Sequence, residues 1–253
     1  MPADPNAQTG APIVAVRGLE KRYAFGDSHV DVLRGVDLTL GAGESCAIMG
    51  PSGVGKSTLL ACVAGLVVPD GGAARVLGED IAKLDDRGRT LLRRRMGIVY
   101  QFFHLVPNLT VRENVALPFL VDGVPADDDA VDSLLDRVGL RSRKGHLPSQ
   151  LSGGEMQLAA IARALVRRPA LVLADEPTGN VNVETGRRIL ALLLDVLREA
   201  GAALLLVTHH PEHAARFERV EFLKDGVLAA EAALSGAAVS PEAVHDRLKS
   251  LGI

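Results

Sequence analysis

A glycine-rich loop at Gly50–Ser57 carries the residue types that bind phosphate groups. It reads Gly-Pro-Ser-Gly-Val-Gly-Lys-Ser, between the apolar segment Ser45–Met49 and the helix-like segment Lys56–Leu66. Backbone N–H groups of such a loop close around phosphate oxygens, and a lysine here pairs with the β and γ phosphates. The hydroxyl of Ser57 is a ligand that Mg²⁺ accepts. The loop therefore predicts a site for a nucleoside triphosphate.

Two carboxylates follow the apolar segment Leu171–Ala174. Mg²⁺ prefers oxygen ligands and keeps several waters, so Asp175 suits a magnesium site beside the phosphates. Glu176 is then placed to orient or deprotonate the water that attacks the γ-phosphate. The competing interpretation is an acidic pair that caps a helix before Pro177.

A histidine stands at the end of another apolar segment, where Ala203–Val207 is followed by Thr208 and His209. The carboxyl ends of parallel strands converge on one crevice, so His209 is expected to reach the γ-phosphate as a donor. The alternative for a lone histidine is a solvated loop residue, and no role is predicted for the adjacent His210.

Aromatic and amide side chains complete the candidate set. Tyr23 is predicted to stack on adenine, with Phe25 as the rival ring and core packing as the alternative. Gln101 follows the apolar segment Gly97–Tyr100 and could connect the magnesium site to a mobile part of the chain. The segment Phe102–Asn108 combines apolar residues with a proline and is typical of a surface that contacts a partner.

These side chains need strands and helices that bring them together. Ile13–Leu19 and Val30–Leu40 alternate apolar and polar residues, which predicts a half-buried antiparallel sheet. Strands and helices then alternate around the phosphate loop, which predicts an α/β fold with a parallel sheet covered by helices on both faces. The strands expected in that sheet are Ser45–Met49, Gly97–Tyr100, Leu171–Ala174 and Ala203–Val207.

Helical spacing dominates from about residue 101 to 165, with helices expected at Val111–Leu120, Ala126–Val138 and Glu155–Val166. This part is predicted to be a helical subdomain inserted into the α/β core. Near the end of the chain, an Asp-Gly turn predicts a hairpin, and Ser240-Pro241-Glu242 predicts a helix start. We expect a flexible tail over residues 1–12 and a single domain over residues 13–253.

Composition limits the remaining classes. The chain has 253 residues, 47% of them hydrophobic, and a net charge of −3, which argues against disorder and against bulk binding to nucleic acid. Apolar runs are shorter than the roughly 20 residues of a membrane span. The first residues lack the pattern of a signal peptide. Cys46 and Cys62 are expected to be buried thiols rather than a disulfide.

Residues Leu151–Gln157 read Leu-Ser-Gly-Gly-Glu-Met-Gln and lie between the phosphate loop and the paired carboxylates. With this signature included, the chain resembles the ATP-binding subunits of ABC transporters from about Ile13 to Ala229. The resemblance is specific because the motifs occur in the family's order: Tyr23, Walker A at Gly50–Ser57, Gln101, the signature, Walker B at Leu171–Asp175, Glu176, the D-loop Gly179–Asn182 and His209.

The resemblance implies a RecA-like P-loop ATPase core with an antiparallel β subdomain and an inserted helical subdomain. It implies ATP and Mg²⁺ as cofactors, with Glu176, His209 and Lys56 catalytic and with Ser57, Gln101 and Asp175 at the metal. Two copies would pack head to tail, so that the signature of one closes over the phosphate held by the other. The residues expected at the nucleotide are Tyr23, Gly50, Pro51, Ser52, Gly53, Val54, Gly55, Lys56, Ser57, Thr58, Gln101, Ser152, Gly153, Gly154 and Glu155.

The sequence around Gln101 and Glu176 is most similar to the LolD, MacB and FtsE group, whose members work with a separate membrane permease. This implies a cytoplasmic place, peripheral on the inner face of the cell membrane. Export, lipoprotein release, mechanical signalling of the FtsE type and a soluble non-transport ATPase remain alternatives. Three positions depart from the family: Asn182 replaces an aspartate, Leu158 replaces an arginine and His210 replaces an aspartate.

Overall fold

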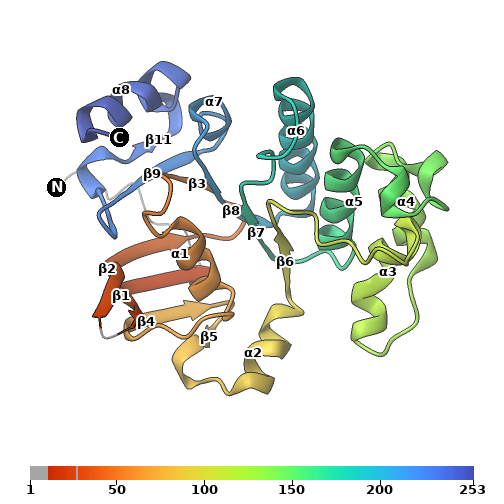
Figure 1. Ribbon diagram of the computed structural model, residues 1–253, viewed down its shortest axis with the longest axis horizontal. Coiled ribbons are helices and arrows are strands. Elements are labelled where there is room, and N and C mark those ends of the chain that lie inside the picture. Colours follow the sequence, from red (N-terminus) through yellow and green to blue (C-terminus); the bar gives the residue numbers. More distant parts are fainter. Residues whose placement is uncertain (1–10, 27) are drawn as a thin grey trace.

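Two sheets form the frame of the molecule (Figure 1). The computed structural model describes residues 11–26 and 28–253. Most of the tail predicted for residues 1–12 lies outside the described residues. In the described part of the chain, no helix combines the length and the apolar character needed to cross a membrane.

The smaller sheet is antiparallel, as the alternating pattern predicts. Its strand order is β2-β1-β4-β5, and register shifts interrupt the pairing of β1 with β2 and with β4. The strands are longer than predicted because the exposed residues beyond Leu19 still pair with β2. Their bounds are β1 Val14–Phe25, β2 Ser28–Leu40, β4 Gly71–Val76 and β5 Glu79–Asp80.

The larger sheet has the order β10-β9-β3-β8-β7-β6, with β11 also paired to β9. The central strands run parallel, which confirms the α/β prediction. The strands are β3 Ser45–Met49, β6 Met96–Val99, β7 Leu171–Asp175, β8 Ala203–Thr208, β9 Arg219–Lys224, β10 Val227–Leu228 and β11 Leu234–Ser235.

The β9–β10 hairpin turns at Asp225 and Gly226, which have φ angles of 50° and 80°. Positive φ at both central residues is the geometry that an Asp-Gly turn provides at low cost, so this prediction is confirmed. Strand β11 was not predicted, since two residues without a turn signal carry no recognisable period.

Helices cover both faces of the larger sheet. Helix α1 (Lys56–Val63) belongs to the core that joins the parallel sheet to the antiparallel one. Helix α6 (Val183–Ala200) packs on the opposite face together with α7 (Pro211–Ala214) and α8 (Pro241–Leu251). Ser240 caps α8 as predicted, whereas α7 ends earlier than the predicted Phe217.

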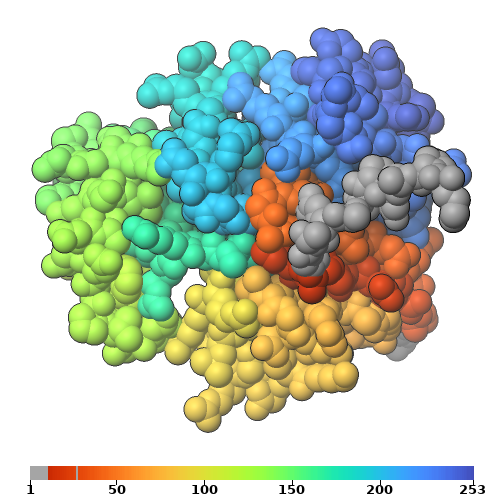
Figure 2. All heavy atoms as spheres, turned by 180° about the vertical axis from the view of Figure 1, so that it is seen from behind, coloured from red at the N-terminus to blue at the C-terminus, as the bar shows by residue number. Residues whose placement is uncertain are grey.

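Helices α3 (Val111–Val121), α4 (Asp128–Arg137) and α5 (Gly153–Leu165) share a third apolar core. They lie together on the side of the molecule away from the antiparallel sheet (Figure 1), and this green region forms one end of the space-filling view (Figure 2). Helix α2 (Asp86–Arg93) contains several arginines and lies between the antiparallel sheet and β6 in the sequence.

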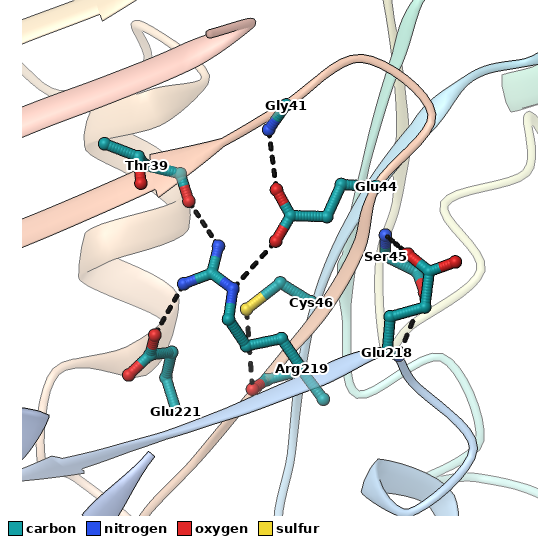
Figure 3. Close-up of polar contacts among 9 residues, drawn as sticks. Thr39, Gly41, Glu44, Ser45, Cys46, Glu218, Arg219 and Glu221 are labelled. Atoms are coloured by element: carbon teal, nitrogen blue, oxygen red, sulfur yellow. Dashed lines mark hydrogen bonds and ion pairs between the residues drawn. The ribbon is translucent and has the colours of Figure 1, made fainter. Parts of the chain in front are cut away.

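A largely enclosed ion cluster joins the two sheets where the chain enters β3, with Glu221 buried and Arg219 and Glu44 partly buried (Figure 3). Nε of Arg219 on β9 lies 2.7 Å from Oε1 of Glu44, and its Nη1 lies 2.5 Å from Oε1 of Glu221. Nη2 of Arg219 donates to the backbone carbonyl of Thr39 at the end of β2. Cys46 lies in the same region as a fully buried free thiol, and burial raises its pKa. Both cysteines are free, as predicted.

Candidate nucleotide site

The carboxyl ends of neighbouring parallel strands bring the predicted residues together. Met49 at the end of β3 pairs with Thr208 at the end of β8, and Asp175 at the end of β7 pairs with Val207. The phosphate loop, Glu176 and His209 follow these positions directly, and Gln101 lies just beyond β6. Strand register therefore places four separate sequence motifs at one edge of the sheet.

The phosphate loop is shaped by close contacts. Gly55 has a φ of 111°, and a Cβ atom there would lie 2.9 Å from Cγ1 of Val32. A Cβ on Gly50 would lie 2.3 Å from the carbonyl oxygen of Leu223. Only glycine fits these two positions, and among the described residues no side chain caps the start of α1. The N–H groups at this helix end are suited to bind an anion.

Lys56 lies across the loop, where its Nζ donates to the carbonyls of Gly50 at 2.8 Å and Pro51 at 2.9 Å. Its side chain is largely buried. Burial lowers the pKa of Lys56, and the nearby carboxylates of Glu176 and Asp175 act in the opposite direction. The loop thus holds a cation next to two acids.

The hydroxyl of Ser57 donates to Oδ1 of Asp175 at 3.0 Å, which joins the phosphate loop to the end of β7. Burial raises the pKa of Asp175, aided by the charge of Glu176 and opposed by Ser57 and Lys56. A hydroxyl and a carboxylate are oxygen donors that fit Mg²⁺ completed by phosphate and water. The described residues contain no cluster of three or more His, Cys, Asp or Glu side chains that could hold a metal.

Glu176 is a buried acid in a strained backbone conformation, with a φ of 45°. Its Oε1 lies 2.8 Å from Nδ1 of His209. Within the described part of the chain, its Oε2 is buried and has no hydrogen-bond partner. This oxygen can therefore still accept a hydrogen bond from a group that enters the cleft.

These groups line one cleft of about 510 Å³. The ring of Tyr23 is part of its wall, with Nζ of Lys21 at 5.4 Å from the ring centroid, whereas Phe25 is not. Gly50, Pro51 and Val54 belong to the phosphate loop but do not line the cleft. Asp175 does not line it either, but it accepts a hydrogen bond from Ser57, which does. The lining residues are Tyr23, Val32, Ser52, Gly53, Gly55, Lys56, Ser57, Thr58, Gln101, Glu176 and His209.

Val32 was not predicted to line the cleft, because a valine in a strand carries no chemical signal. Gln101 was predicted, and its backbone carbonyl accepts from Nδ2 of Asn180 at 2.8 Å. Gly179 lies so close to Gln101 that a Cβ atom would be 3.0 Å from its Nε2. Gln101 therefore contacts both the cleft and the segment that follows Glu176.

The signature residues occupy a different place. Ser152, Gly153, Gly154 and Glu155 line a second cleft of about 710 Å³ between α5 and α6, away from Lys56. Ser152 caps α5, and its backbone N–H donates to Oε2 of Glu155 at 2.8 Å, while Arg143 pairs with the same carboxylate. The chain thus does not bring its own signature to its own phosphate loop.

The three departures from the family pattern also have defined places. Asn182 caps α6 by accepting from the backbone N–H of Thr185 at 2.9 Å, a task that aspartate performs equally well. Leu158 lines the signature cleft. The ring of His210 lies between those of His209 and His213, with centroids 4.0 Å and 4.9 Å away.

Comparison with known proteins places this site in a family. The model of the family described as "ABC transporter" matches residues 33–179. The lipoprotein-releasing system ATP-binding protein LolD of Alcanivorax borkumensis is 47% identical over 220 residues, which cover 86% of this chain and 96% of that protein. LolD of Ruegeria pomeroyi is 46% identical over 224 residues, covering 87% and 98%.

Solved structures agree. A dimeric ATP-binding cassette in a post-hydrolysis state with ADP and Pi is 37% identical, with a TM-score of 0.79 over 85% of this chain and 96% of that one. A second dimeric structure, of a bacterial ABC transporter cassette, has the same TM-score at 36% identity. The fold, the phosphate loop, the paired carboxylates and these relatives together establish that the chain belongs to the ABC transporter family, as an ATP-binding ATPase subunit.

Proposed function

We propose that the chain binds ATP with Mg²⁺ in the cleft lined by Tyr23 and the phosphate loop, and hydrolyses it there. The observation that carries the proposal is the convergence of Lys56, the Ser57–Asp175 hydrogen bond and the Glu176–His209 hydrogen bond on one edge of the sheet. Mg²⁺, held by Ser57 and Asp175 with Gln101 nearby, would supply positive charge against the phosphates.

The residues of the chain divide the work of hydrolysis. Tyr23 stacks on the adenine, and the N–H groups of the loop and of α1 bind the phosphates. Lys56 neutralises negative charge on the γ-phosphate as the transition state forms. Its Nζ is held beside the loop by the carbonyls of Gly50 and Pro51.

Glu176 and His209 act on the water. Oε2 of Glu176 accepts a proton from the water. At the same time the water oxygen bonds to the γ-phosphorus, and the bond between the γ-phosphorus and the leaving oxygen of ADP breaks. Because Oε1 is held by Nδ1 of His209, the carboxylate is oriented before the reaction, and Nε2 of the ring is left for the γ-phosphate. The products are ADP and phosphate, as in the post-hydrolysis cassette that the chain resembles.

The active unit is proposed to be a head-to-tail pair of chains. Ser152, Gly153, Gly154 and Glu155 lie in a cleft separate from Lys56, so a second copy must supply them to a given ATP. The start of α5 there presents backbone N–H groups and glycines suited to an anion. The two solved cassettes compared above are dimeric.

The pair is proposed to drive a separate integral-membrane permease, on the inner face of the cell membrane. The LolD relatives are named as ATP-binding proteins of a lipoprotein-releasing system, so lipoprotein release is the favoured process. Gln101 and the exposed Phe102 follow β6 and lead into the helical part, which makes this segment the proposed route from the site to the permease.

Phosphate release by the purified chain tests the hydrolysis. We expect turnover with ATP and Mg²⁺, loss of turnover with excess EDTA and loss in Lys56→Ala. Lys83→Ala is the matched control, because Lys83 is exposed and is not among the residues that line the cleft. An active Lys56→Ala variant would overturn the site assignment.

Purification from membranes tests the partner. A permease that co-purifies and releases lipoprotein from vesicles on ATP addition supports the proposal. A bound permease with no released cargo but with control over a cell-wall hydrolase would replace transport by signalling of the FtsE type, and association with ribosomes would exclude a transporter role.

A further inference from the structure

A buried side-chain hydrogen bond connects the two segments that carry Glu176 and His209, in addition to the bond between those two residues. Oγ1 of Thr178 lies 3.0 Å from Nδ1 of His213, and both side chains are buried, at 5% and 7% exposure. Thr178 belongs to the turn closed by the bond from the N–H of Gly179 to the carbonyl of Glu176. The backbone N–H of Glu176 also donates to the carbonyl of Val207 at 3.1 Å, so hydrogen bonds join the two segments at the backbone, at the reactive pair and behind it.

The contacts form a closed ring. His213 lies in α7, and its backbone N–H donates to the carbonyl of His210 at 3.1 Å. The ring of His210 lies against that of His209, which returns to Glu176. Every link from Glu176 through Thr178, α7 and His209 back to Glu176 is thus a hydrogen bond, a ring contact or a short run of chain.

Helix α6 holds this arrangement from behind. A Cβ atom on Gly186 would lie 3.3 Å from Cβ of Thr178 and 3.6 Å from Cε1 of His213. A polar pair enclosed this closely cannot exchange its hydrogen bond for water, so the bond fixes the distance between the two segments. Neither Thr178 nor His213 lines the nucleotide cleft.

We propose that His213 is a positioning residue for hydrolysis, which fixes the Glu176 carboxylate against His209 through its hydrogen bond to Thr178. The proposal rests on the catalytic roles proposed above for Glu176 and His209. His213 would act through Thr178, because its own side chain does not line the nucleotide cleft.

The neutral ring suits this task. Burial is the main cause that lowers the pKa of His213, to about 4, with His210, Arg216 and Arg187 acting in the same direction and Glu212 opposing them. At neutral pH the ring therefore has one N–H, and Nδ1 can accept from the hydroxyl of Thr178. A residue that accepts at the same place would preserve the bond.

Steady-state hydrolysis by a set of variants tests the proposal. His213→Phe keeps the ring but loses the bond, and we expect kcat to fall roughly tenfold while KM for ATP changes less than about twofold, because only the alignment of Glu176 is lost. Thr178→Val should have the same effect. The double variant should be hardly worse than either single variant, since both remove one bond.

Rescue separates positioning from bulk. His213→Asn places an amide oxygen near the position of Nδ1 and should restore most of kcat, and Thr178→Ser should do the same for the hydroxyl. His245→Phe on the exposed face of α8 is the matched control and should hydrolyse ATP like the wild type.

The outcomes are distinct. Wild-type kcat in both His213→Phe and Thr178→Val, with the wild-type chain active, overturns the positioning role and leaves the proposed function standing. A fall in kcat that Asn and Ser do not restore also overturns it. An inactive wild-type chain rejects the proposed function itself. If His213→Phe does not fold, Thr178→Val, which replaces only a hydroxyl by a methyl, answers the same question.

Discussion

Replacing Arg219 by methionine should destabilise the whole fold, because it leaves the buried Glu221 and the partly buried Glu44 without their cation. The side chains of Arg219, Glu44 and Glu221 are 20%, 21% and 11% exposed, and the arginine also satisfies the carbonyl of Thr39. Breaking a buried ion pair by removing one partner typically costs about 3–5 kcal/mol, since the remaining charge stays in a poorly solvated place.

Urea unfolding followed by circular dichroism measures this cost. At about 2–3 kcal/mol per molar of urea, a loss of 3–5 kcal/mol moves the midpoint by more than about 1 M. The matched control replaces the cluster as a whole, with Arg219→Met combined with Glu44→Gln and Glu221→Leu. Because no unpaired charge remains, the triple variant should recover most of the loss.

The pH dependence gives a second, independent test. Burial raises the pKa of Glu221 even with Arg219 present, and loss of the arginine must raise it further. A carboxyl with a raised pKa in the folded state favours folding when protonated, so the cost of Arg219→Met should be smaller at pH 5 than at pH 8. A midpoint equal to that of the wild type at pH 8 would refute the reasoning.

Three further results are expected. Glu176→Gln should lower turnover by at least roughly a hundredfold while retaining ATP, so that the dimer accumulates in size-exclusion chromatography; wild-type turnover would remove the assignment of this residue. Gly55→Ala should lose ATP affinity and about 2 kcal/mol of stability in thermal melting, because of its φ of 111° and its contact with Val32, whereas Gly145→Ala, with open space around it, should melt like the wild type. Burial lowers the pKa of His213 from 6.5 to about 4 in the folded chain. The free energy of unfolding should therefore fall by about 2 kcal/mol, allowing for solvent screening, as the pH drops from 6.5 to 4. Equal acid sensitivity in His213→Asn would contradict this.

The sequence was sufficient for the fold and for most of the nucleotide cleft. Glycines, a lysine and paired acids at fixed spacing after apolar strands are local signals, and the strand register then brought them together. Contacts that depend on tertiary packing were out of reach. Val32 beneath Gly55 and the bond between Thr178 and His213 join distant segments, and nothing in the type of either residue indicates the other.

The burial of charged side chains could not be predicted from the sequence pattern either. Arg219 stands in a strand where an exposed charge would look no different in sequence, and only the approach of β2, β3 and β9 shows that it is enclosed by two acids. The length of α7 was also beyond local reasoning, because Arg216 and Phe217 are polar and apolar residues compatible with a further helical turn.

The separation of the signature cleft from the phosphate loop has a genetic consequence. If each ATP is enclosed by two chains, a copy defective in either cleft removes one of the two sites from every dimer that it forms with an intact copy. Equal production of wild-type and defective chains, pairing at random, leaves only about a quarter of the dimers wholly intact. Conversely, a chain damaged only at Ser152 and one damaged only at Lys56 still make one complete site between them. The effect of such alleles would thus depend on which chains pair with each other, and not only on the amount of each chain.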